Sequence, residues 1–123
     1  MKEIQVRFAT PGDIDAILHF VRLLAAYEHM EDQVEATAEM YRREIFENNR
    51  AEVLLALDEE GGPAGMALFF HSFSTWQGRC GIYLEDLFVL PERRGRGYGR
   101  ALLRRLARLT LERNGGRLEW SCL

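Results

Sequence analysis

The residues best suited to chemistry in this sequence are the arginines and glycines of segment 93–100, which reads RRGRGYGR. Alternating glycines let the backbone approach a ligand without hindrance from Cβ atoms. The helix expected after them points unpaired N–H groups and its positive dipole end at the loop. Four arginines within eight positions add charged hydrogen-bond donors. The segment therefore predicts an anion-binding site.

The spacing of these glycines excludes two familiar phosphate loops. A Walker loop ends in Gly-Lys-Ser or Gly-Lys-Thr, and a dinucleotide fingerprint places GxGxxG after the first strand. Here Gly95, Gly97 and Gly99 alternate after a late strand. Arginine–glycine segments that bind nucleic acid are repeated and disordered, whereas this one occurs once between two ordered elements. We therefore expect no nucleic-acid partner.

The charges of the chain are strongly polarised along its length. Residues 1–90 hold seven basic and sixteen acidic side chains, for a net charge of −9, whereas residues 91–123 hold nine arginines and three glutamates, for +6. This asymmetry is consistent with two partners of opposite sign: an anion on the C-terminal third and a cation on the rest. Charges that merely coat solvated faces would give the same count, so both readings stay open here.

The apolar periodicity predicts the elements that must position these residues. Thr10 and Asp13 can form a capping box, and Thr37 can cap a second helix. Glycines 115 and 116 are expected to supply the left-handed residue that ends the last helix. The predicted helices are 11–28, 38–48 and 97–113, and the predicted strands are 4–8, 53–57, 64–74, 80–89 and 118–123.

This order of elements predicts a single α/β domain over residues 1–123. Strand 80–89, helix 97–113 and strand 118–123 form a βαβ crossover, which makes those two strands parallel in an otherwise mostly antiparallel, mixed sheet. The last strand leaves one edge unpaired at the end of the sequence. We therefore expect the domain to be C-terminally incomplete, with final strands and a helix to follow, or another chain to cover that edge.

The cysteines, the histidines and the hydropathy of the chain predict no further functional site. Cys80 and Cys122 lie far apart without a CxxC motif and are expected to be buried reduced thiols. The histidines 19, 29 and 71 lack metal-ligand spacing, so no metal is expected. No segment has the roughly 20 apolar residues of a membrane span, and no leader pattern is present. We expect a cytoplasmic protein with no membrane partner.

The pattern Arg94-x-x-Gly97-x-Gly99, placed after the strand 82–89 (IYLEDLFV), resembles the pyrophosphate loop of the GNAT family of N-acetyltransferases. Segments 24–34 (LAAYEHMEDQV), 83–89 and 117–120 (RLEW) are similar to the branch that acetylates diamines such as spermidine and spermine, or thialysine. The resemblance spans the chain from about residue 4 to residue 123. It implies the GNAT fold, acetyl-CoA as cosubstrate, a small cationic amine as substrate and a homodimer.

The resemblance also implies roles for individual residues. The backbone of Leu87, Phe88 and Val89 would meet the pantetheine arm and the thioester. Tyr27, Glu28 and Glu85 would contact the amine. The pyrophosphate would be wrapped by Arg94, Gly95, Arg96, Gly97, Tyr98, Gly99 and Arg100.

The mechanism implied is direct acetyl transfer in a ternary complex. An alkyl ammonium has a pKa near 10.4, so a carboxylate must remove its proton, and Glu85 is the candidate general base. The Leu87 N–H would polarise the thioester carbonyl. The general acid of the family is a tyrosine expected beyond Leu123. The alternatives are a catalytically weak CoA-binding or interaction module, and a GNAT enzyme that acts on an amino acid or a protein amine.

Overall fold

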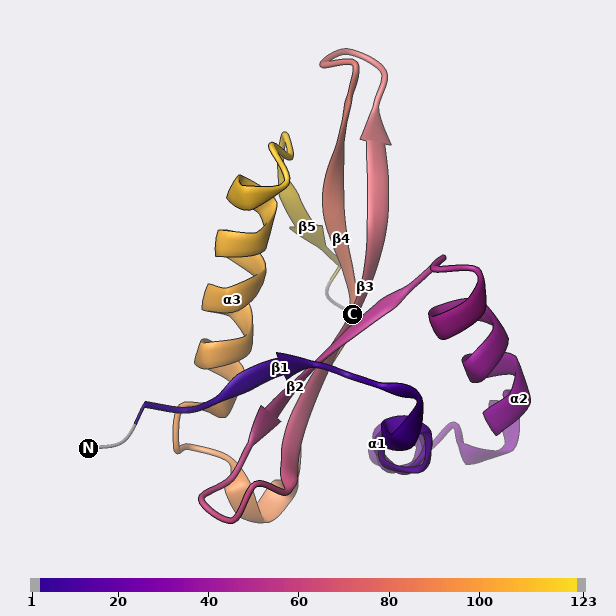
Figure 1. Cartoon of the computed structure of the whole chain (residues 1–123). Helices are drawn as coiled ribbons and strands as arrows, with labels where there is room; N and C mark the ends of the chain where they lie inside the picture. The colour runs from indigo at the N-terminus through magenta and orange to yellow at the C-terminus, as the bar shows by residue number, and fades with distance from the viewer. Residues whose placement is uncertain (1–2, 122–123) are drawn as a thin grey trace.

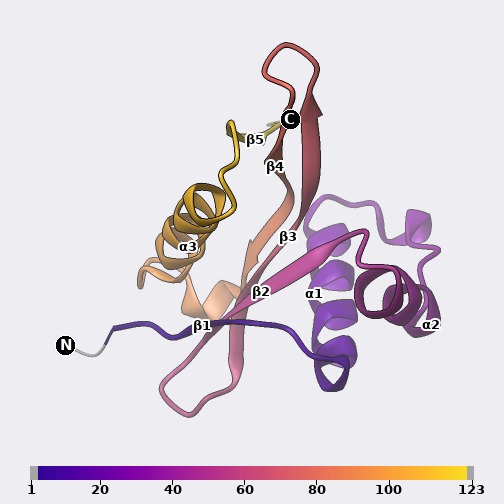
Figure 2. The same ribbon diagram turned by 45° about the horizontal axis from the view of Figure 1, so that its top comes forward.

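A five-stranded sheet separates two layers of helices in the computed structural model, which describes residues 3–121. Helix α3 covers one face of the sheet, and helices α1 and α2 cover the other (Figure 1). The same two layers are seen on either side of the sheet after a 45° turn (Figure 2). The mixed α/β class predicted from the sequence is confirmed.

The elements lie close to their predicted positions. The strands are β1 Val6–Phe8, β2 Glu52–Leu57, β3 Pro63–Ser74, β4 Arg79–Val89 and β5 Leu118–Trp120. The helices are α1 Ile14–Tyr27, α2 Ala38–Tyr41, which continues as a π-helical turn Arg42–Glu47, and α3 Tyr98–Glu112. The strands lie in the order β1-β2-β3-β4-β5, with antiparallel pairs except for the parallel pair of β4 and β5.

Both predicted helix starts are present. The Asp13 carboxylate accepts from the Thr10 backbone N–H at 2.7 Å and closes the capping box before α1, after a 3₁₀ turn over Pro11–Asp13. Arg7 donates to the same carboxylate at 2.8 Å and 3.0 Å, and this pairing lowers the pKa of Asp13 to about 2. Before α2, the Met40 N–H donates to the Thr37 hydroxyl at 3.3 Å.

Two sequence predictions at the ends of elements are wrong. The left-handed residue after α3 is Asn114, with φ 56°, and not a glycine. A short polar side chain lets Asn adopt this conformation. Gly115 instead permits a close approach, because its N–H donates to Thr110 O at 2.7 Å. Cys80 is exposed, because the β3–β4 hairpin extends beyond the helices there (Figure 1), whereas Cys122 lies outside the described residues.

Apolar side chains form a separate core on each face of the sheet. Under α3, Leu102 and Leu106 are fully buried against the sheet residues Leu54 and Phe69. Under α1, the buried residues include Ile17, Phe20, Val53, Leu55 and Phe88. Strand β4 therefore sits between two packed layers, which fix its position.

Strand β4 has β5 beside it along only part of its length. Strand β5 pairs with it only at Ile82, Tyr83 and Leu84. A Cβ atom at Gly81 would lie 2.5 Å from the Arg117 backbone oxygen, so only glycine admits this close pairing. Within residues 3–121, the edge of β4 that faces away from β3 has no strand beside it after Leu84.

A β-bulge lies at the point where β5 departs. Leu84 pairs with Phe69 and Asp86 pairs with Leu68, so Glu85 has no opposing residue on β3. The extra residue changes which side chains face which layer. Leu84 belongs to the core under α3, whereas Phe88 belongs to the core under α1.

No helix within the described part of the chain is both long enough and apolar enough to cross a membrane.

Candidate functional site

The open edge of β4 presents backbone groups that no neighbouring strand binds within the described residues. The Leu90 N–H donates to Ala64 O at 2.9 Å, which makes this a hydrogen-bonded pair of the antiparallel ladder. Such pairs alternate, so the backbone groups of Leu87 and Val89 point away from β3. The Val89 oxygen indeed accepts from Arg94 Nε at 3.1 Å on that side. The edge can therefore bind an extended ligand through its backbone.

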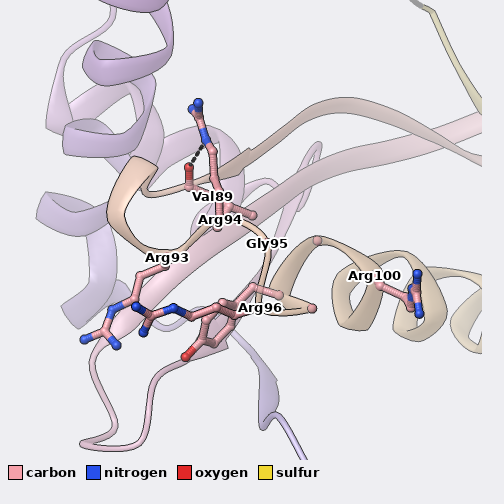
Figure 3. Close-up of a pocket in the computed structure, with 9 residues that line it drawn as sticks. Val89, Arg93, Arg94, Gly95, Arg96 and Arg100 are labelled. Atoms are coloured by element: carbon pink, nitrogen blue, oxygen red, sulfur yellow. Dashed lines mark hydrogen bonds between the residues drawn. The ribbon is translucent and has the colours of Figure 1, made fainter.

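A pocket of about 570 Å³ lies at the end of this strand, where the chain enters α3 (Figure 3). Gly95 and Gly97 have φ of 78° and 95°, in the left-handed region that favours glycine. The first backbone bond of α3 runs from the Ala101 N–H to Gly97 O, so the N–H groups that precede it are not used by the helix. The pocket is lined by Val89, Arg93, Arg94, Gly95, Arg96, Gly97, Tyr98, Gly99 and Arg100.

The four arginines of the loop do not act as one group. Arg93 pairs with Asp58 and Glu59 of the β2–β3 turn, each at 3.3 Å. In Figure 3, the Arg94 side chain points away from those of Arg93 and Arg96.

Arg96 and Arg100 therefore remain as the charged donors of the pocket. Neither makes an ion pair within residues 3–121. The sequence could not predict which of the four arginines are paired, since the partners of Arg93 lie more than thirty positions earlier in the chain. Left-handed glycines, helical N–H groups and two unpaired guanidinium groups suit a pyrophosphate.

Tyr98 lines the pocket but cannot offer its ring to a ligand. Its side chain is only 4% exposed and belongs to the core under α3. Its contribution to an anion site would come from its backbone N–H at the start of the helix.

A second set of charged side chains, all carboxylates, lies near β4 and the end of α1. Asp86 is half-buried, and burial raises its pKa, with further rises caused by the charges of Glu85 and Glu28. Sequence reasoning selected Glu28 and Glu85 but missed Asp86. The sequence shows that Asp86 follows Glu85. It does not show the bulge, which determines the face of the sheet on which Asp86 lies. Glu85 and Glu28 thus both lie within electrostatic reach of Asp86.

The end of α1 connects this acidic group to the loop. Tyr27 is 68% exposed, and the Arg94 guanidinium lies over its ring at 5.2 Å. Glu28 follows Tyr27 directly and is exposed. The half-buried Tyr41 lies on the same side, where burial and then the charge of Asp86 raise its pKa. The predicted amine residues and the predicted anion loop therefore meet at the contact of Tyr27 with Arg94.

The part of the chain that the structure describes contains no group of three or more His, Cys, Asp or Glu side chains arranged to hold a metal ion.

Comparison with known proteins identifies the family. Residues 19–123 match the acetyltransferase (GNAT) family. This chain belongs to that family. It is 37% identical to thialysine N-epsilon-acetyltransferase of Bos taurus over 131 residues, which cover 100% of this chain and 76% of the relative. It is 36% identical to the Caenorhabditis elegans protein of the same name, with 100% and 75% covered.

A further relative supports the branch predicted from the sequence. Spermidine/spermine N(1)-acetyltransferase-like protein 1 of Homo sapiens is 31% identical, over 90% of this chain and 17% of that protein. The chain is therefore a GNAT N-acetyltransferase of the diamine and thialysine branch. The family uses acetyl-CoA as its cosubstrate.

Solved structures agree on the fold alone. An aminoglycoside acetyltransferase from a soil metagenomic sample superposes with a TM-score of 0.81 at 17% identity, over 98% of this chain and 78% of that one. Ribosomal-protein-alanine N-acetyltransferase from Brucella melitensis gives 0.77 at 20% identity, over 98% and 80%. The GNAT fold expected from the resemblance is confirmed.

Asp86→Asn should make the protein more stable at neutral pH. The folded-state pKa of Asp86 is raised, so its ionisation disfavours folding above that pKa and does not affect folding below the unfolded pKa near 3.9. Because the group is partly solvated, we expect a gain of about 0.5–1 kcal/mol at pH 7 and none at pH 3. Urea unfolding at both pH values measures this. The exposed Asp32→Asn is the matched control, and an equal gain there would contradict the account.

Proposed function

We propose that this protein transfers the acetyl group of acetyl-CoA directly to a primary amine of a small cationic substrate, a diamine, polyamine or thialysine-like molecule, in a ternary complex. The observation that carries the proposal is the position of β4 between two sites of opposite charge. An arginine–glycine loop lies at its end, and three carboxylates lie around its bulge. An anion and a cation bound there would meet beside the same strand.

The cosubstrate half of the proposal rests on the open edge and the loop. Backbone groups of Leu87 and Val89 would pair with the pantetheine arm, as a missing strand would. The phosphates would bind the helix N-terminus and the guanidinium groups of Arg96 and Arg100. The residues present fit this ligand, because an added Cβ atom at Gly95 would meet nothing within 4 Å and the loop is open to solvent.

Bound acetyl-CoA would supply an acetyl thioester as the electrophile. The Leu87 N–H would donate to the carbonyl oxygen as negative charge develops there. A preformed backbone donor requires no reorganisation at that moment, because its direction is set by the pairing of β4 with β3.

The amine-binding half of the proposal rests on the carboxylates. Glu28 and Asp86 would attract and hold the ammonium group. Glu85 would accept its proton, directly or through a water, so that the amine lone pair can attack. The raised pKa of Asp86 is the physical mark of a site where an added cation is favoured, since the cation would offset the repulsion among the three groups.

The leaving thiolate needs a proton from a general acid. The tyrosine expected beyond Leu123 stays a prediction, as do the homodimer and the cytoplasmic location. Among the tyrosines near β4, Tyr98 is buried in the core, so its hydroxyl is poorly placed for this role. A catalytically weak CoA-binding module remains the alternative, and activity assays separate the two.

Gly97→Asp should abolish the binding of acetyl-CoA. Wild-type protein gains about 2.7 kcal/mol of stability at a ligand concentration a hundredfold above Kd. The substitution places a negative charge in the pocket at a residue with φ 95°. Gly78→Asp is the matched control, because Gly78 is also left-handed, at φ 67°, but lies in the β3–β4 turn. Thermal unfolding with acetyl-CoA measures both, and an equal ligand-induced Tm shift in the Gly97 variant would contradict the loop assignment.

The carboxylate variants should divide into binding and proton-transfer roles. With thialysine and spermidine as test amines, Glu28→Gln should raise KM and leave kcat nearly unchanged, since it removes an attraction present in ground and transition states. Glu85→Gln should lower kcat by roughly 10²- to 10⁴-fold if Glu85 is the general base. Steady-state kinetics that follow CoA release measure both.

The pH profile distinguishes Glu85 from its neighbour. Loss of the general base should flatten or shift the acidic limb of the kcat profile, whereas loss of a binding charge should leave it in place. If Asp86→Asn alone removes the limb, Asp86 is the base and the assignment to Glu85 is wrong. If an aminoglycoside or a protein N-terminus is acetylated better than both test amines, the substrate class is wrong while the cosubstrate site stands.

A further inference from the structure

Arg94 is the one loop arginine whose side chain lies on the open edge of β4. Its Nε donates to Val89 O at 3.1 Å, as the dashed line in Figure 3 shows. Its guanidinium carbon lies 5.2 Å from the centroid of the Tyr27 ring and 5.5 Å from that of Phe88. The side chain therefore touches both the strand edge that would bind the cosubstrate and the helix end that would bind the amine.

We propose that Arg94 is a displaceable cap, which covers the Val89 carbonyl and places a positive charge at the amine site until the cosubstrate's arm removes it. This inference rests on the proposed function, because it assigns a regulation to that same site. It differs from the simple expectation that Arg94 is a phosphate ligand. In this conformation the guanidinium contacts a backbone carbonyl and two aromatic rings.

Competition follows from the hydrogen bond. The pantetheine arm carries two amide groups, and a strand edge binds such a chain through its own N–H and C=O groups. The Arg94 side chain, which donates to the Val89 oxygen from its open side, occupies the place from which an amide N–H of the arm would donate. Because Arg94 is exposed, only its hydrogen bond to Val89 O and its contacts with the rings of Tyr27 and Phe88 oppose its movement away from the carbonyl.

Electrostatics couples the cap to the second substrate. The guanidinium over Tyr27, the residue before Glu28, is a permanent cation that opposes the approach of another cation to the same end of α1. Its displacement by the arm would leave the aromatic face and the carboxylates to the amine. The coupling must be reciprocal, so a bound amine would also strengthen binding of the arm. The cap thus predicts that the cosubstrate binds first.

The test compares two ligands that differ in the arm. CoA and adenosine 3′-phosphate 5′-diphosphate carry the same three phosphates, but only CoA has pantetheine. The ratio of their dissociation constants therefore reports what the arm contributes. In Arg94→Met and Arg94→Ala, we expect this ratio to favour CoA by a further five- to thirtyfold, roughly the effect of one hydrogen bond and one exposed cation–π contact. Isothermal titration calorimetry measures the dissociation constants of both ligands for wild type and for the two variants.

Arg96→Met is the matched control. Arg96 belongs to the same loop and lines the pocket, so its loss should weaken CoA and adenosine 3′-phosphate 5′-diphosphate by the same factor and leave the ratio unchanged. If the Arg94 variants weaken both ligands equally, Arg94 is a phosphate ligand and the cap is wrong. If wild-type protein binds neither ligand, the proposed function fails and this inference fails with it.

A second readout tests the coupling. Thialysine, titrated without CoA, should bind the Arg94→Met variant several-fold more tightly than wild type, and CoA should strengthen its binding only to wild type. Circular dichroism confirms that each variant is folded. If CoA strengthens thialysine binding equally in wild type and in Arg94→Met, the coupling does not pass through Arg94, which overturns the inference.

Discussion

The site depends on one structural constraint: β4 has a partner strand on both sides only as far as Leu84. Up to that residue, the close contact of Gly81 with the Arg117 backbone holds β5 against β4. Beyond it, the N–H and C=O groups of Leu87 and Val89 have no strand to bind within the described residues. Unpaired backbone groups at a sheet edge are a binding surface for any extended chain with amide groups. Two packed layers keep that edge rigid.

Side chains of opposite charge lie near this edge: carboxylates around the bulge at Glu85 and arginines in the loop that follows β4. The bulge directs Asp86 to the side of α1, where burial, and then the charges of Glu85 and Glu28, raise its pKa. The chain then turns through left-handed glycines into α3, where positive charge collects. The proposed sites for the cation and the anion thus lie beside the same end of β4. The low solvation of Asp86 disfavours folding at neutral pH, which is the expected cost of a site prepared for a cation.

Much of this arrangement could be predicted from the sequence, because it depends on local signals. The Thr10 capping box, the apolar alternation of the strands and the glycine spacing act over a few residues each, and the parallel pairing of β4 and β5 follows from the helix between them. The bulge could not be predicted, since it depends on how β4 pairs with β3. The ion pairs of Arg93 and the contact of Arg94 with Tyr27 could not be predicted for the same reason, because these partners lie more than thirty positions earlier in the chain. The end of α3 was misassigned because Asn114 and Gly115 can both follow a helix, and the sequence does not say which takes the left-handed conformation.

Amide hydrogen exchange, resolved by residue with NMR, tests the open edge most directly. In the free protein, the Leu87 amide should exchange far faster than the Phe88 amide, because the ladder binds Phe88 to β3 and leaves Leu87 free. Addition of acetyl-CoA should slow exchange at Leu87 and leave Phe88 unchanged. If Leu87 is already protected in the free protein, or if acetyl-CoA protects the loop before α3 but leaves Leu87 exchanging as before, the edge of β4 is not where the cosubstrate lies.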